Sequence, residues 1–135
     1  MLIYYYRVVK NMTVYIGDTC FWSNVVDTVI LKEIRSPDNR LITPSRVAGE
    51  IKGNAVYLSP SFRNFLISPE MVDTRYEGTR PLHGEDLSRA DTQILRIAQE
   101  EIRRGPVYVL TDDRALKNTI YANVPGVVVV ESNIF

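Results

Sequence analysis

Short apolar segments alternate with segments of helical periodicity along this chain, and that alternation constrains the fold most strongly. Residues 13–17, 107–110 and 127–130 are largely unbroken apolar runs, as in strands buried on both faces. Residues 87–104 instead repeat apolar side chains at helical spacing. Strands that alternate with helices predict a mainly parallel sheet of four or five strands. We therefore expect an α/β fold, a three-layer α/β/α sandwich.

Capping and turn residues place the remaining elements. Ser88, with Asp91 three residues later, is an expected N-cap of the long helix. Pro44 at a first helical position and Gly53 after the last turn bound another helix. Further elements are expected as helices at residues 24–34, 60–66 and 113–122, a strand at 40–43 and an extended segment at 71–76.

Length, charge and cysteine content indicate a single domain spanning residues 1–135. Residues 1–11 are expected to be an N-terminal extension, within which Leu2–Val9 could add an edge strand; the alternative is that the chain naturally starts at Met12. No apolar run is long enough for a membrane span. A single cysteine, Cys20, cannot form an internal disulfide, which favours a reducing, cytoplasmic setting. Taken alone, the formal net charge of zero argues against a strongly basic nucleic-acid-binding protein, but if four of the 16 acids hold a metal, the 16 basic residues exceed the remaining 12 acids by four, so charge alone does not decide.

Acidic residues fall where an open α/β sheet presents its ligands, outside the carboxyl ends of the strands. Asp18 directly follows the first strand, and Asp112 and Asp113 follow the strand at residues 107–110. Glu50 lies on the helix after the second strand, and Asp91 lies in the first turn of the long helix. We expect the carboxylates of Asp18, Glu50, Asp91 and Asp113 to converge in one pocket.

Each of these acids also has a purely structural explanation. Asp91 and Asp113 could cap their helices, Glu50 could lie on a solvated helix face, and Asp18 could form a turn. Four acids clustered together, however, would repel one another and would have to hold protons or bind a cation. Oxygen ligands without histidine or cysteine suit Mg²⁺ or Mn²⁺ rather than zinc.

Four segments, in order, resemble the motifs of the PIN-domain ribonucleases. They are residues 15–19, 43–51, 87–98 and 110–116, and the resemblance runs from about residue 13 to 132. It implies that Asp18, Glu50, Asp91 and Asp113 are catalytic and hold the metal, that Asp112 is a neighbouring candidate ligand, and that Thr19 and Thr111 contribute hydroxyl groups.

The resemblance also implies an activity, divalent-metal-dependent endonucleolytic hydrolysis of single-stranded RNA that leaves a 5′-phosphate and a 3′-hydroxyl. RNA is then the expected partner, with a homodimer as the expected assembly and an antitoxin or assembly factor as a further possible partner. Within the family the segments look closer to RNA-processing members than to most toxins. The alternative function is a catalytically silent module that binds RNA or protein.

Arginines near the site are expected to hold the RNA backbone, unless they form ordinary solvated helix faces. The basic residues in question are Arg75, Arg80, Arg89, Arg96, Arg103, Arg104, Arg114 and Lys117.

Other reaction classes lack their residues. A haloacid-dehalogenase phosphatase needs an acid where Cys20 stands, and a nucleotide-binding fold needs a glycine-rich loop after the first strand. His83 has no partnered motif, and Cys20 is interpreted as a packing residue. The exposed aromatic stretch at residues 4–6, with Phe62 and Phe65, is the candidate dimer surface.

Overall fold

A computed structural model describes residues 12–25, 34, 36–53, 57–81 and 87–134. Five strands form one parallel sheet in the order β3-β2-β1-β4-β5, which confirms the expected α/β class and strand number. The strands are β1 (Thr13–Gly17), β2 (Asn39–Pro44), β3 (Val72–Asp73), β4 (Val107–Leu110) and β5 (Val128–Val130).

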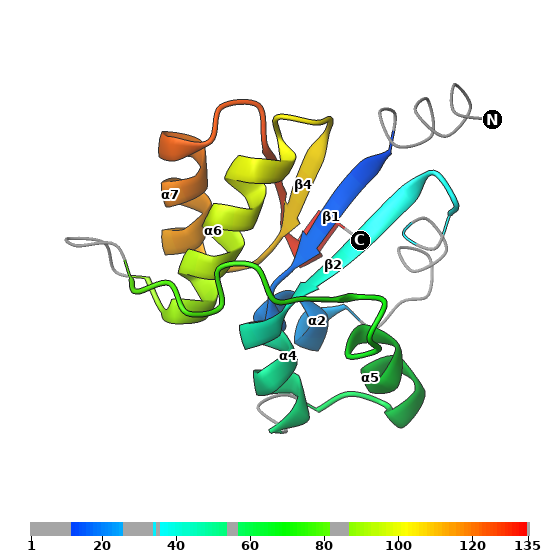
Figure 1. The fold of residues 1–135 in the computed structure, drawn as a ribbon. Coiled ribbons are helices and arrows are strands. Elements are labelled where there is room, and N and C mark those ends of the chain that lie inside the picture. The colour runs from blue at the N-terminus through cyan, green and yellow to red at the C-terminus, as the bar shows by residue number, and fades with distance from the viewer. Residues whose placement is uncertain (1–11, 26–33, 35, 54–56, 82–86, 135) are drawn as a thin grey trace.

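Helices follow the strands in the pattern that a parallel sheet requires. They are α2 (Thr19–Asn24), α4 (Ser45–Lys52), α5 (Pro60–Leu66), α6 (Arg89–Glu101) and α7 (Arg114–Asn123). Figure 1 shows α6 and α7 side by side against one face of the sheet, with α2 and α5 near the carboxyl ends of β1 and β2. The arrangement is compatible with the expected three-layer sandwich.

Several element boundaries differ from the expected ones. Pro44 is the N-cap of α4 rather than its first helical residue. The extended segment expected at residues 71–76 narrows to the two residues of β3, and a turn follows. The helix expected at residues 24–34 lies mostly outside the described residues, whereas α2 occupies the segment just before it. The expectations for residues 1–11 and for His83 also lie outside the described residues.

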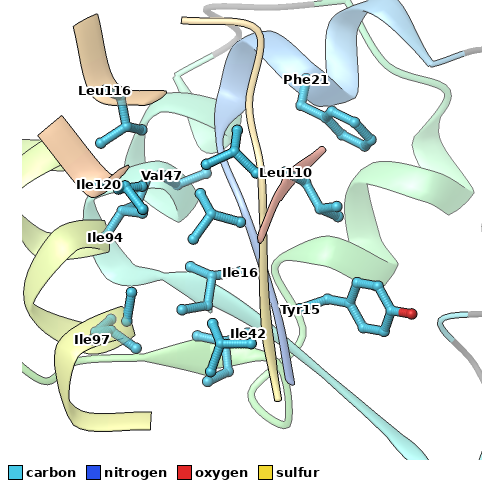
Figure 2. Close-up of a cluster of buried hydrophobic side chains, with 14 of the residues drawn as sticks. Tyr15, Ile16, Phe21, Ile42, Val47, Ile94, Ile97, Leu110, Leu116 and Ile120 are labelled. Atoms are coloured by element: carbon cyan, nitrogen blue, oxygen red, sulfur yellow. The ribbon is translucent and has the colours of Figure 1, made fainter. Parts of the chain in front are cut away.

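The core fills both faces of the sheet. On one face Ile16 and Ile42 lie toward Ile94 and Ile97 of α6, whereas Tyr15 points to the opposite face (Figure 2). Alternate residues of each strand thus contact different layers, which explains why the strands are apolar throughout.

Gly17 ends β1 as a glycine because an indole ring occupies the space beside its Cα. A Cβ at that position would lie 2.3 Å from Trp22, far inside contact distance. Trp22 is 1% exposed, so the ring has no free space into which to move. This close approach packs α2 directly against the strand end and places Asp18 between them.

An ion-pair network holds the opposite end of α6. Glu101, which is only 2% exposed, pairs with Arg40 at 3.2 Å and with Arg75 at 3.5 Å. Arg75 also bonds Asp73 of β3 at 2.7 Å, and Arg104 approaches Glu101 at 3.6 Å. Arg75, which was expected near RNA, therefore fastens the short edge strand β3 to α6, whereas Arg104 pairs with Glu100 and Glu101 at its own end of α6.

No helix within the described part of the chain is long and apolar enough to cross a membrane. Phe62 and Phe65, expected at a dimer surface, instead pack partly buried against the core, and Phe62 contacts Trp22 edge to face.

Candidate functional site

Asp18 lies at the junction of β1 and α2, where its side chain is 6% exposed. It is the N-cap of α2 and accepts a hydrogen bond from the Thr19 backbone N–H at 2.8 Å. Its Oδ2 accepts a second bond from the Thr111 hydroxyl at 2.9 Å and a third from the Cys20 thiol at 3.1 Å. Burial raises the pKa of Asp18 despite these donors.

Asp113 follows β4, the strand beside β1, and is the N-cap of α7. Its Oδ1 accepts a hydrogen bond from the Leu116 backbone N–H at 3.0 Å, as a helix cap should. Its own backbone N–H donates to the Thr111 hydroxyl at 3.0 Å. Thr111, fully buried, thus links Asp113 to Asp18 across the two strands.

Asp91 is the third acid at this edge, and the structure leaves it the most strongly perturbed. It lies in the first turn of α6, where Ser88 caps the helix by accepting from the Asp91 backbone N–H at 3.1 Å. Burial, followed by repulsion from Asp18 and Asp113, raises the pKa of Asp91 to about 7. A carboxyl group in this setting holds its proton to a much higher pH than an ordinary aspartate does.

Glu50 is the fourth acid and the most exposed of the four. Its partial desolvation on α4, together with repulsion from Asp18, raises its pKa, while Thr19 opposes the shift. The Thr19 hydroxyl is buried and lies near enough to Glu50 to lower its pKa, although the contact falls outside strict hydrogen-bond geometry. Thr19 therefore brings a buried oxygen to the space between Asp18 and Glu50.

Asp112, by contrast, is turned away from the other acids. Its carboxylate accepts hydrogen bonds from the Ser132 backbone N–H at 2.7 Å, from the Ser132 hydroxyl at 2.6 Å and from Asn24 at 2.7 Å. Burial raises its pKa, but these donors outweigh burial and hold the pKa below its usual value. The structure thus brings Asp113 to the other acids and uses Asp112 to join α2 to the C-terminal segment.

Cys20 contributes a contact that sequence reasoning missed. Instead of acting only as a packing residue, its thiol donates to Asp18 and lies 3.6 Å from the Thr111 hydroxyl. Burial and the charge of Asp18 raise the pKa of Cys20 to about 11, so the thiol keeps its proton. Its place two residues after the first acid was the available signal, because the side chain of an N-cap residue reaches the second and third residues of the helix that it caps.

The four acids form an uncompensated group of negative charge. Asp18 interacts electrostatically with each of the other three. None of the four makes an ion pair with any residue that the structure describes. An oxygen-only donor set of this kind, with the buried Thr19 hydroxyl beside it, fits a hard divalent cation.

The four acidic side chains do not converge on a single point, however. Within the described ranges, no group of three or more acidic, histidine or cysteine side chains is arranged to hold a single metal ion. The expected convergence is therefore incomplete, and one oxygen each of Asp18 and Asp113 accepts a hydrogen bond that caps a helix.

A cleft of about 820 Å³ opens beside these acids. It lies between α4, the turn after β3 and the amino end of α6, and Glu50 is on its wall. Buried Gln93 of α6 fixes the turn, donating to the Asp73 and Arg75 carbonyls at 3.3 and 2.9 Å. The site therefore has the chemistry to bind a cation through oxygen ligands, and an open groove lies beside it.

Comparison with models of protein families and with curated proteins finds no match to this chain.

Proposed function

We propose that this chain is a PIN-like endoribonuclease that hydrolyses single-stranded RNA with Mg²⁺ or Mn²⁺. One observation carries the proposal: four carboxylates, from β1, α4, α6 and the end of β4, repel one another at the carboxyl edge of a parallel sheet without a positive partner among the described residues. The order of the four sequence motifs, which resembles the PIN pattern, supports the same function.

The cation ligands in this proposal are Asp18, Asp91 and Asp113, with Glu50 completing the set. A divalent cation at these residues would supply Lewis acidity toward a phosphodiester and would neutralise the repulsion among the acids. The protein itself supplies the ligand oxygens, from acids at the ends of strands and helices. Because the fold fixes the backbone at these ends, cation binding requires little further ordering of the backbone.

Glu50 is the candidate for orienting the attacking water and accepting its proton, because partial burial and repulsion from Asp18 raise the pKa of Glu50. Glu50 lies on the wall of the cleft, where it can contact a substrate directly. Thr111 and Cys20 position Asp18 by donating hydrogen bonds to the same oxygen.

The test is cleavage of unstructured RNA by the purified chain with Mg²⁺ or Mn²⁺, with and without EDTA. Wild type should cut, EDTA should abolish cutting, and Asp91→Asn should reduce the rate at least about a hundredfold. Asp38→Asn is the matched control because Asp38 is exposed in the turn before β2, at the amino edge of the sheet. That variant should cut at the wild-type rate.

Two results would count against the proposal. If Asp91→Asn cuts as fast as wild type, the activity comes from another site or a contaminant. If wild type binds neither cation in calorimetry and cuts no RNA, a catalytically silent binding module becomes the better proposal, and the incomplete convergence of the acids favours that alternative.

The expected partners remain predictions. Light scattering tests whether the chain forms homodimers, and co-purification tests whether it binds an antitoxin or an assembly factor.

A further inference from the structure

The cleft beside the acids has three walls from different parts of the chain. Helix α4 forms one wall, the turn after β3 a second, and the amino end of α6 the third. Figure 1 shows the segment after β3 passing between α4 and α6 at the carboxyl ends of the strands. The lining residues are Ser45, Arg46, Gly49, Glu50, Glu77, Gly78, Ser88, Arg89 and Ala90.

Glycines keep this cleft open on two of its walls. A Cβ built on Gly49 or on Gly78 would meet no atom within 4 Å. The absence of a side chain at these positions is therefore not required by packing, in contrast to Gly17, where Trp22 fills the space. Both glycines instead expose backbone to the cleft and leave room for a ligand to approach closely.

Two arginines of the cleft differ from those of the ion-pair network. Neither Arg46 nor Arg89 makes an ion pair with a described residue, whereas Arg75 and Arg104 are paired with Glu100 and Glu101. Arg46 donates through Nε to the Glu77 carbonyl at 2.7 Å, which holds its guanidinium at the cleft. The cleft therefore offers two cationic groups that make no ion pair with a described residue, beside the carboxylates of Glu50 and Glu77.

The cleft is continuous with the acidic group. Glu50 belongs to both, since it lines the cleft and interacts with Asp18. Ala90 lines the cleft and is followed directly by Asp91. An elongated anion held in the cleft would thus lead directly to the acids.

We propose that the cleft holds the stretch of RNA next to the cleaved bond, with Arg46 and Arg89 contacting its phosphates and with Gly49 and Gly78 making room for a sugar or base. This inference rests on the proposed function and adds the path of the substrate. A volume of about 820 Å³ is that of a site for a small ligand, so one or two nucleotides of the strand fit within it.

A size series at Gly49 tests the path. RNA affinity is measured by fluorescence anisotropy with a short labelled oligouridine, in Mg²⁺, on full chains that also carry Asp91→Asn so that the RNA stays intact. Affinity should fall progressively from Gly49→Ala through Gly49→Leu to Gly49→Trp, by at least about tenfold for Trp. Asn118→Trp, which adds the same ring at an exposed position of α7, should leave affinity unchanged.

A charge series tests the phosphate contacts. Arg89→Gln should weaken binding and lower the slope of log K against log salt by about 0.7, the effect of losing one phosphate contact to a single strand. Arg103→Gln, an exposed arginine just beyond the other end of α6, should leave the slope unchanged.

Failure of the path and failure of the proposed function give different results. If the chain with Asp91 restored cuts RNA, and Gly49→Trp then cuts and binds RNA as well as the chain with Gly49, the cleft is not the path. The nuclease proposal stands in that case. If no chain in the series binds RNA, both proposals fall. Circular dichroism checks folding, and if Gly49→Trp does not fold, Gly78→Trp fills the cleft from the turn and is judged by the same affinity threshold.

Discussion

The hydroxyl of Thr111 donates a hydrogen bond of 2.9 Å to Asp18, which lies 93 positions earlier in the chain. The same oxygen accepts the backbone N–H of Asp113 at 3.0 Å. Because β1 and β4 are neighbours in the sheet, one buried side chain is able to fix the acids that follow both strands. The spacing of these two acids therefore depends on a residue that carries no charge.

Thr111→Val should lower both stability and activity. Valine is nearly isosteric, but it removes one of the two donors to a buried oxygen of Asp18 and leaves the N–H of Asp113 without its acceptor, which should cost about 1–3 kcal/mol of unfolding free energy. Urea unfolding measures this loss. Thr111→Ser keeps the hydroxyl and should retain most of the cleavage activity. If the serine variant is inactive and the valine variant is active, the hydroxyl is not required for cleavage.

The cation-free protein should lose stability as pH rises from about 4 to about 7. The folded pKa of Asp91 is raised from 3.8 to about 7, so between these values the folded state binds a proton that the unfolded state has lost. Unfolding then becomes easier with rising pH, by an amount on the order of a few kcal/mol. Thermal melts across this pH range in EDTA should show the decline in wild type and a much smaller decline in Asp91→Asn. Equal slopes in the two proteins would contradict the assignment.

The sequence predicts which acids follow the strands and which residue caps α6 better than it predicts the contacts that their side chains make. Asp18 and Asp113 were placed correctly because an acid after a parallel strand must lie at the carboxyl edge of the sheet. Ser88 was also placed correctly, because capping is decided by a few consecutive residues.

Contacts between distant segments could not be predicted in this way. The choice between Asp112 and Asp113 depends on Ser132 and Asn24, whose side chains reach Asp112 only once β5 and α2 are packed. Arg75 was read as a candidate for RNA binding, yet its role is set by the buried Glu101 of α6. In each case tertiary packing selects one of several side chains that are equivalent in the sequence.

Cys20 should react slowly with iodoacetamide. Burial and the neighbouring Asp18 raise the pKa of its thiol to about 11, so at pH 8 about one molecule in a thousand carries the thiolate. A free cysteine at that pH is about one quarter thiolate, so alkylation of the folded chain should be at least about a hundredfold slower. Mass spectrometry follows the reaction, and the urea-unfolded chain is the control. Rapid alkylation of the folded protein would mean that the thiol does not donate to Asp18.

Glu101→Gln should destabilise the fold without impairing RNA cleavage. Glu101 is buried between Arg40, Arg75 and Arg104, and its loss leaves their charges partly unpaired. Because Arg40 and Arg104 are largely exposed, water compensates much of the loss, and a cost of about 1–3 kcal/mol is expected. Urea unfolding gives the cost. A cleavage rate per folded molecule that falls along with stability would show that the network also serves the site.

Mn²⁺ should reverse the stability order of wild type and Asp91→Asn. In EDTA at pH 8 the variant should melt at the higher temperature, because it removes a buried charge that Asp18 and Asp113 repel. With Mn²⁺ at about a hundred times its Kd, wild type should gain about 2.7 kcal/mol by binding linkage. The variant, which lacks a ligand charge, should gain much less, so wild type should then melt at the higher temperature. Asp38→Asn should follow wild type in both buffers, because Asp38 lies at the amino edge of the sheet. If Mn²⁺ raised the melting temperatures of wild type and Asp91→Asn equally, the cation would bind elsewhere, and Asp91 would be a buried carboxyl group with no part in holding it.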